Sequence, residues 1–295
     1  MEKNLNLQSM KWYERYLKVY DKPFNEAAHA DIIEETRKKI AQMQSATPLA
    51  TISVIAYNEE KHLLACLWAL SNIQCKYPVE VIGVNNNSKD RTEDVFKAVG
   101  IPYYNETKQS CGYARLCGLM KANGKYHFNI DADTLYPEKY MEHFIDLFEK
   151  HPETVGISAT WSYIPDEKHS SLGIWLYTTL RDCYLWMLSF KRPELSVRGL
   201  VFAYRTKEAQ ETGIRTDIIR GEDGYLAFQL KKYGRIRFTR CKKTQAITGY
   251  GTLNVSLTEG FLIRMKQALH KVGHLFSKAD AYKDQESNLV KKKPL

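Results

Sequence analysis

Hydrophobic and polar positions alternate in blocks from residue 49 onwards. Short apolar runs rich in β-branched residues predict buried strands, and longer segments with apolar residues every three or four positions predict helices. The predicted strands are Ala50–Ala56, Val79–Val84, Ile101–Tyr104, Tyr126–Ile130 and Val155–Trp161. The predicted helices between them are Asn58–Asn72, Asp90–Val99, Cys111–Ala122 and Pro137–Lys150. At least four strand–helix alternations predict an α/β fold with a mostly parallel sheet flanked by helices.

The alternation weakens on both sides of this region. Residues 1–47 are polar and helical in pattern, and they either pack on the main domain or mediate contacts with other molecules. After residue 161 we predict a strand and two helices, Gly199–Tyr204, Gly221–Tyr233 and Leu257–Phe276. We therefore expect a helical N-terminal extension (1–47), one main domain (48–276) and a polar basic tail (277–295).

Polar clusters follow three of the predicted strands. They are Tyr57-Asn58-Glu59, Asn85-Asn86-Asn87-Ser88 and Asp131-Ala132-Asp133. In open sheets of this kind, ligands bind at the carboxyl ends of the strands. The three clusters are therefore expected to meet in one binding crevice.

The Asp131-Ala132-Asp133 cluster suggests a metal. Two carboxylates held together just beyond a buried strand are costly unless a cation neutralises them. A hard divalent ion takes oxygen ligands and commonly bridges carboxylate and phosphate oxygens. The competing interpretation is a turn that caps the helix after Pro137.

A second acidic pair, Glu222-Asp223, opens the predicted helix 221–233. The helix dipole favours carboxylates at this end, so capping alone would explain the pair. The alternative is a general base, which an attacking hydroxyl needs in order to lose its proton. The run Asn85–Ser88 likewise has two interpretations, a turn or a set of amides that read a nucleobase edge.

Composition and charge add limits. Of the 295 residues, 44% are hydrophobic and 26% are charged, as in folded globular proteins. A formal net charge of +9 favours anionic partners without choosing among phosphorylated ligands, lipids and nucleic acid. The six cysteines lack metal-binding spacing, and the first eight residues lack an apolar signal core. We therefore expect a cytoplasmic protein with reduced thiols.

The segment Leu172–Phe190 is apolar and rich in Trp and Tyr. Arg181-Asp182 at its middle argues against a membrane span. We favour a packed helix. The alternatives are a platform for an acceptor sugar, or peripheral contact with the inner face of a membrane.

Several stretches resemble, in order, the motifs of glycosyltransferase family 2. Ile52–Glu60 resembles its opening strand, Val81–Thr92 its second motif, Gly112–Gly118 with Ala122–Tyr126 the helix before the metal motif, Asp131-Ala132-Asp133 its Asp-X-Asp, and Gly221–Leu226 its Glu-Asp-X-X-Leu helix. The resemblance covers residues 50–240, and the order and spacing of the motifs are more specific than any one of them. The Gln-X-X-Arg-Trp motif of processive members is absent, which favours transfer of a single sugar.

The resemblance implies a GT-A fold, a Rossmann-like single domain that binds a nucleotide-diphospho-sugar. The residues it assigns to the donor are Ala56, Tyr57, Glu59, Asn86, Ser88, Arg115 and Asp131, with Arg115 directed toward the diphosphate. Asp133 and Asp131 would hold Mn²⁺ or Mg²⁺. Asp223 would be the catalytic base, and Glu222 would support it or contact the acceptor.

We therefore expect an inverting, metal-assisted glycosyltransferase that moves one sugar to an acceptor hydroxyl. A UDP-sugar is the favoured donor and a carbohydrate or lipid-linked molecule the acceptor, in cell-surface polysaccharide or glycolipid assembly. Asn86 stands where the family often has an Asp that contacts the nucleobase, so the sequence does not identify the nucleobase of the donor. The alternative function is a catalytically degenerate protein that binds a sugar nucleotide. A basic nucleic-acid-binding module would explain the charge but not the polar strand ends, so we expect no nucleic-acid partner.

Overall fold

A seven-stranded sheet forms the centre of the computed structural model, which describes residues 11–165, 167, 170–218 and 220–249. The strands of this sheet are β1 (Ala50–Ala56), β2 (Val79–Asn85), β3 (Tyr103–Asn105), β4 (Tyr126–Asp131), β6 (Thr154–Ser158), β8 (Phe202–Arg205) and β9 (Arg235–Phe238). Their order is β3-β2-β1-β4-β8-β6-β9. A smaller sheet has the order β5-β10-β7, from Thr134–Leu135, Ala246–Thr248 and Trp161–Tyr163.

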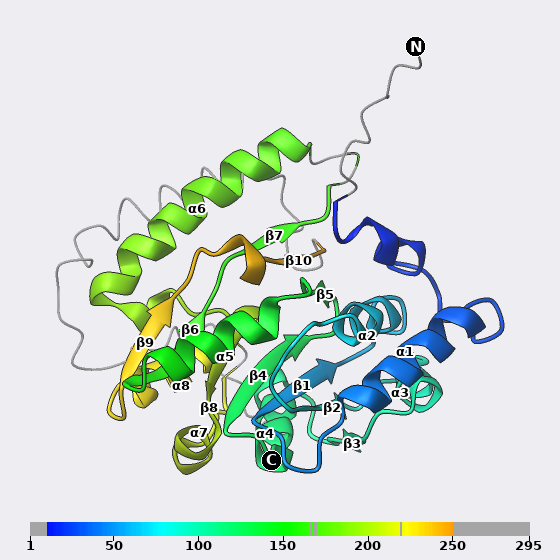
Figure 1. The fold of residues 1–295 in the computed structure, drawn as a ribbon, viewed down its shortest axis with the longest axis horizontal. Coiled ribbons are helices and arrows are strands. Elements are labelled where there is room, and N and C mark those ends of the chain that lie inside the picture. Colours follow the sequence, from blue (N-terminus) through cyan, green and yellow to red (C-terminus); the bar gives the residue numbers. More distant parts are fainter. Residues whose placement is uncertain (1–10, 166, 168–169, 219, 250–295) are drawn as a thin grey trace, which may run out of the picture.

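The helices lie around the central sheet (Figure 1). They are α1 (Ala30–Met43), α2 (Leu63–Ser71), α3 (Thr92–Val99), α4 (Cys111–Lys121), α5 (Tyr140–Lys150), α6 (Ser171–Lys191), α7 (Thr206–Thr212) and α8 (Glu222–Leu230). Short 3-10 turns are η1 (Glu14–Lys18), η2 (Pro193–Leu195), η3 (Gly199–Val201) and η4 (Lys242–Thr244). The predicted helix Leu257–Phe276 and tail 277–295 lie outside the described residues.

The predicted mostly parallel sheet is confirmed. β1 pairs in parallel with both β2 and β4, and β2 pairs in parallel with β3. Within the described sheet, β8 is the strand that runs antiparallel to its neighbours, β4 and β6. The carboxyl ends of β1, β2 and β4 therefore lie at the same edge, which is where the three polar clusters were expected to meet.

Several predicted elements differ from the structure. The strand Gly199–Tyr204 is the turn η3 followed by β8, and the helices expected from Asp90 and Pro137 begin at Thr92 and Tyr140. The strand Val155–Trp161 is two strands, because β6 ends at Ser158 and β7 joins the smaller sheet. The helix expected from Asn58 begins at Leu63. The turn before it holds Asn58 at a φ of 54°, and the backbone N–H of Glu59 donates to Thr92 Oγ1 at 2.7 Å. These constraints keep the segment out of helical geometry.

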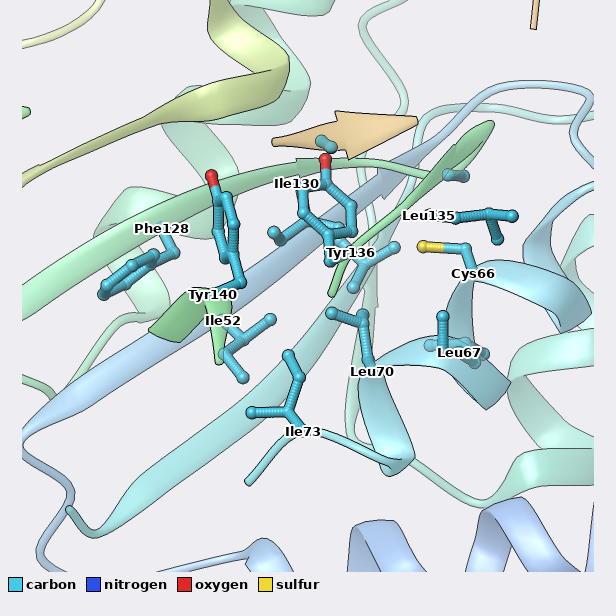
Figure 2. Packing of buried hydrophobic residues seen from close by; sticks show 14 of the residues in the cluster. Ile52, Cys66, Leu67, Leu70, Ile73, Phe128, Ile130, Leu135, Tyr136 and Tyr140 are labelled. Atoms are coloured by element: carbon cyan, nitrogen blue, oxygen red, sulfur yellow. The ribbon is translucent and has the colours of Figure 1, made fainter. Parts of the chain in front are cut away.

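The main core lies between the sheet and the helices α2 and α5. Figure 2 shows Ile52 of β1 near Leu70 of α2, Phe128 of β4 beside Tyr140 of α5, and Tyr136 between Tyr140 and Leu70. All five side chains are fully or almost fully buried. Burial of such side chains, at roughly 25 cal/mol per Å² of apolar surface, is the main favourable term that holds the helices on the sheet.

The described part of the N-terminal extension packs on this core. Tyr16 of η1 is buried, and its ring meets Trp68 of α2 edge-on at 5.1 Å between centroids. Ile33 and Ile40 of α1 are also buried in the main core. Of the two roles considered for residues 1–47, the structure shows packing on the main domain for residues 11–47.

Candidate functional site

The loops after β1 and β2 are tied together. The backbone N–H of Asn58 donates to Ser88 Oγ at 3.0 Å, and the N–H of Lys89 donates to Asn58 Oδ1 at 2.8 Å. Asn58 and Asn87 have φ values of 54° and 57°, a left-handed conformation that Asn tolerates better than most residues. The predicted donor residue Ser88 thus positions the loop that follows β1.

Asn86 lies beside the end of β1 and is 3% exposed. Its backbone N–H donates to the Ala56 carbonyl at 2.9 Å. Its side-chain Nδ2 donates to the carbonyls of Glu106 (3.3 Å) and Lys108 (2.9 Å). Both amide hydrogens are therefore used, and Oδ1 is left as an acceptor. The nearby Tyr57 is 42% exposed.

Arg115 of α4 joins three of the predicted acidic residues. Its guanidinium is 3% exposed and lies 3.0 Å from Asp131, 3.5 Å from Glu222 and 3.3 Å from Asp223. A buried cation is stable only with such partners. The end of β4 and the start of α8, far apart in sequence, are thereby brought to one point. Within the described residues, Nη1 of Arg115 has no hydrogen-bond partner.

Two glycines permit this arrangement. A Cβ added at Gly118 would overlap Ser53 Oγ, so α4 can approach β1 closely only with glycine there. A Cβ added at Gly199 would overlap both Arg115 Nη2 and Asp223 Oδ2. These polar atoms are held in ion pairs and cannot easily move aside. Gly199 therefore leaves the room that the Arg115–Asp223 pair needs.

Asp223 is held by a buried polar chain. Asn129 Nδ2 donates to Asp223 Oδ1 at 3.1 Å, and Tyr204 OH donates to Asn129 Oδ1 at 3.0 Å. Burial raises the pKa of Asp223, Arg115 opposes this, and the nearby carboxylate of Glu222 raises it further. We did not predict Asn129 or Tyr204, although the signal for Asn129 was available, since it is a polar residue inside an apolar strand.

Asp133 lies in a second acidic group. Its Oδ1 accepts a hydrogen bond from Thr134 Oγ1 at 3.0 Å, and its backbone carbonyl accepts one from Tyr20 OH at 2.8 Å. Burial raises the pKa of Asp133, as do the negative charges of Asp131 and Glu59. The described protein groups around Asp133 therefore disfavour the negative charge of its ionised carboxylate.

A histidine that was not predicted belongs to this second group. His62 Nδ1 lies 2.7 Å from Glu59 Oε2, and the His62 ring lies 4.8 Å from the ring of Tyr20. Burial lowers the pKa of His62, but the hydrogen bond and charge of Glu59 outweigh it, so the net change is upward. No spacing in the sequence distinguishes His62 from an ordinary helix-start residue.

The residues at this strand end fit a particular kind of metal site. No group of three or more His, Cys, Asp or Glu side chains suited to a metal ion occurs in the part of the chain that the structure describes. A complete cage of protein ligands is therefore not formed there. Mg²⁺ is usually bound by one or two carboxylates plus substrate phosphates, and the uncompensated charge of Asp133 beside Asp131 suits an ion of that kind.

Comparison with solved structures identifies the fold class. The mannosyltransferase PcManGT of Pyrobaculum calidifontis, solved with GDP-Man and Mn²⁺, is similar with a TM-score of 0.56 and 16% identity, over 91% of this chain and 77% of that one. S. aureus TarS in complex with UDP gives 0.51 and 16%, over 68% and 60%. At these identities the likeness establishes the GT-A fold alone.

Sequence comparison places the chain in a family. The model of glycosyl transferase family 2 matches residues 51–207, more than half of the chain, so the protein belongs to that family. An uncharacterised glycosyltransferase of Rickettsia prowazekii is 28% identical over 127 residues, which are 42% of this chain and 40% of that protein. One of Rickettsia bellii is 31% identical over 107 residues, 35% and 15% of the two chains. The chain thus matches less than half the length of these relatives.

Proposed function

We propose that the protein is an inverting glycosyltransferase that transfers one sugar from a nucleoside-diphosphate donor to an acceptor hydroxyl. The observation that supports this best is the placement of Asp223. Its carboxylate is fixed by Asn129 at 3.1 Å and by Arg115 at 3.3 Å, and Arg115 also binds Asp131 at the carboxyl end of β4. A candidate base is thereby linked to the edge of the sheet at which donors bind in this fold.

In the proposed reaction, Asp223 accepts the proton of the acceptor hydroxyl while the hydroxyl oxygen attacks the anomeric carbon. The bond from that carbon to the diphosphate oxygen breaks on the opposite face, so the anomeric configuration inverts. A raised pKa makes Asp223 a stronger proton acceptor than an exposed aspartate. Glu222, 5% exposed and 3.5 Å from Arg115, supports this arrangement.

Arg115 has two roles in the proposal. Its ion pairs keep Asp223 and Asp131 oriented, and its unpaired Nη1 is the atom available to a diphosphate oxygen after a small side-chain shift. Asp133 and Asp131 would hold Mn²⁺ or Mg²⁺, which would neutralise charge on the leaving diphosphate. The negative charge of Glu59 raises the pKa of Asp133, and the nearby His62 lowers it.

The nucleobase is proposed from the geometry of Asn86. Because its Nδ2 donates to two backbone carbonyls, the side chain offers Oδ1 as an acceptor, as an aspartate would. Uracil and guanine, like thymine, carry a ring N–H at the matching edge, whereas cytosine and adenine carry an acceptor nitrogen there. We propose a UDP-sugar or GDP-sugar donor, with UDP favoured, and a carbohydrate or lipid-linked acceptor in cell-surface polysaccharide or glycolipid assembly.

Thermal-shift measurements with UDP, GDP, CDP, TDP and ADP, each with and without Mn²⁺, test the donor site. We expect stabilisation by UDP or GDP that increases with Mn²⁺. Asp223→Asn should keep this stabilisation and lose about 100-fold or more in turnover with the matching sugar donor. Absence of any nucleotide effect on the folded protein would contradict the proposal and favour a degenerate relative. Wild-type turnover by Asp223→Asn would remove Asp223 as the base.

A further inference from the structure

Helix α6 runs along one outer edge of the molecule, beside β7 (Figure 1). Its two central charged residues, Arg181 and Asp182, point toward the protein, with side chains 10% and 14% exposed. Arg181 donates to the backbone carbonyl of Trp161 in β7, and its guanidinium lies 3.7 Å from the centre of that ring. The charges that interrupt this apolar sequence are therefore absent from its outer face.

The outer face of α6 is a row of large apolar side chains, called the apolar stripe below. These side chains are 41–73% exposed, and they are Leu172, Trp175, Leu176, Leu180, Trp186, Met187 and Phe190. At 3.6 residues per turn, these positions fall within roughly 140° of the helix circumference, so they lie on one side of the helix. At 1.5 Å per residue, the stripe is about 27 Å long. No charged side chain of α6 between its first and last members is exposed.

The opposite face of α6 is already packed. Ile174, Tyr177, Leu185 and Leu188 are buried against the protein. The apolar stripe is thus additional to what the fold needs, and exposed apolar patches of this extent mark binding surfaces. None of the described helices combines the length and apolar character that a membrane crossing requires. A partner for α6 must therefore accept the helix lying along its surface.

Positive charge borders one end of the stripe. The Arg240 guanidinium lies 5.0 Å from the centre of the Trp186 ring. Lys242 and Lys243, a few residues further on, are exposed. A hollow beside Trp186 is lined by Arg237 and Arg240. Together with the net charge of +9, this suits an anionic surface.

We propose that the apolar stripe and the adjoining basic residues bind the surface of an anionic phospholipid membrane. Trp and Phe side chains with Leu on one helix face, next to arginine and lysine, are the chemistry of helices that lie in the membrane interface. Insertion of the stripe would bury Trp175 and Phe190 among the acyl chains, while Arg240 contacts the lipid phosphates. The contacts described for Asp223 are with Asn129 and Arg115 and involve no side chain of the stripe, so the stripe can be tested without altering the proposed base.

Vesicle co-sedimentation of the full chain tests this proposal. We expect binding to phosphatidylcholine vesicles with about 30% phosphatidylglycerol, weaker binding to phosphatidylcholine alone, and release at high salt. Leu176→Glu/Phe190→Glu should lower the partition coefficient at least about tenfold. Arg240→Glu should reduce the preference for anionic vesicles. Met120→Glu, at an apolar side chain of α4 that is 58% exposed, is the matched control and should bind like the wild type.

Nucleotide-dependent thermal shifts of each variant show that it is folded, and sedimentation velocity gives its oligomeric state. Failure of the wild type to bind anionic vesicles would overturn the proposal. Equal binding by the Leu176/Phe190 variant would do the same. A wild-type dimer that this variant converts to monomers, without vesicle binding, would instead assign the stripe to a second copy of the chain.

Discussion

At the residue scale, Arg115 determines the electrostatics of the proposed active site. One buried guanidinium is shared by Asp131, Glu222 and Asp223, so these carboxylates outnumber their cation. Burial and this excess of negative charge raise the pKa of Asp223, while Arg115 limits the rise. The strength of the proposed base is therefore sensitive to small changes in the position of Arg115.

Gly199 offers a test of that sensitivity. In Gly199→Ala the new Cβ would overlap Arg115 Nη2 and Asp223 Oδ2, and the pair would have to separate. We expect turnover to fall by about 100-fold, the typical effect of a displacement near 1 Å in an active site. UDP-induced thermal shifts should also decrease, because the displaced Arg115 is the residue proposed to contact the diphosphate. Gly213→Ala, which meets no neighbouring atom within 4 Å, is the control for substitution at a glycine, although its φ of 74° adds local strain.

Asn86 gives a second prediction at this scale. Asn86→Leu removes the acceptor Oδ1, so binding of UDP measured by calorimetry should weaken about tenfold, the usual value of one directed hydrogen bond. Weak binding of CDP should be unaffected, so the preference for uracil over cytosine should decrease. Asn87→Gly, an exposed neighbour whose φ of 57° suits glycine, serves as the control. Equal weakening for both nucleotides would indicate general damage to the loop.

At the scale of elements, the seating of α4 on the sheet places Arg115. Gly118 lies one turn after Arg115, and a Cβ there would overlap Ser53 Oγ of β1. We predict that Gly118→Ala lowers the free energy of unfolding by about 1–3 kcal/mol, the usual cost of overpacking. Ser53→Ala/Gly118→Ala should recover most of this loss, because the overlapping oxygen is gone. Urea denaturation measures both, and a double variant no more stable than the single one would refute the contact.

The elements with a clear hydrophobic period were predictable from the sequence. β1 has the predicted bounds, and α4 differs from its prediction by one residue at its end. Strands of two or three residues, such as β5 and β10, show no period and were not predicted. The start of α2 was predicted wrongly, because side chains of another loop hold the preceding turn.

The candidate site also contains features that the sequence could predict and features that it could not. Asp131 and Asp223 were predictable as acidic groups at a strand end and a helix start, because their positions follow from local pattern. Their connection through Arg115 depends on tertiary packing that brings α4, β4 and α8 together. Asn129 stands out locally as a polar residue in an apolar strand, but its partner Asp223 is distant in sequence, and no local pattern singles out Gly199.

At the scale of the whole molecule, stability should depend on pH through His127. This residue of β4 is fully buried, and burial, helped by the positive charge of Arg115, lowers its pKa to about 3. In the unfolded chain its pKa is about 6.5, so below that pH the unfolded state binds a proton that the folded state does not. Stability contributed by neutral His127 is complete above pH 6.5 and is lost as the pH falls toward 3.

We therefore predict a loss of about 3 kcal/mol from this residue between pH 7 and pH 4. Urea denaturation across this range should show a shallower pH dependence for His127→Phe than for the wild type. The comparison uses the difference in slope, so a constant packing effect of the larger ring cancels. Parallel slopes for the two proteins would show that His127 does not titrate differently on folding.

The antiparallel strand β8 also bears on synthesis of the chain. β1 to β4 are contiguous in sequence and pair with one another, so this half of the sheet can assemble while later residues are still being translated. β8, which directly follows η3, then closes the free side of β4, and α8 comes later in the chain. The nascent chain thus has the loops proposed for nucleotide binding before it has Asp223. Interrupted translation would leave a protein that holds a donor but has no base with which to use it.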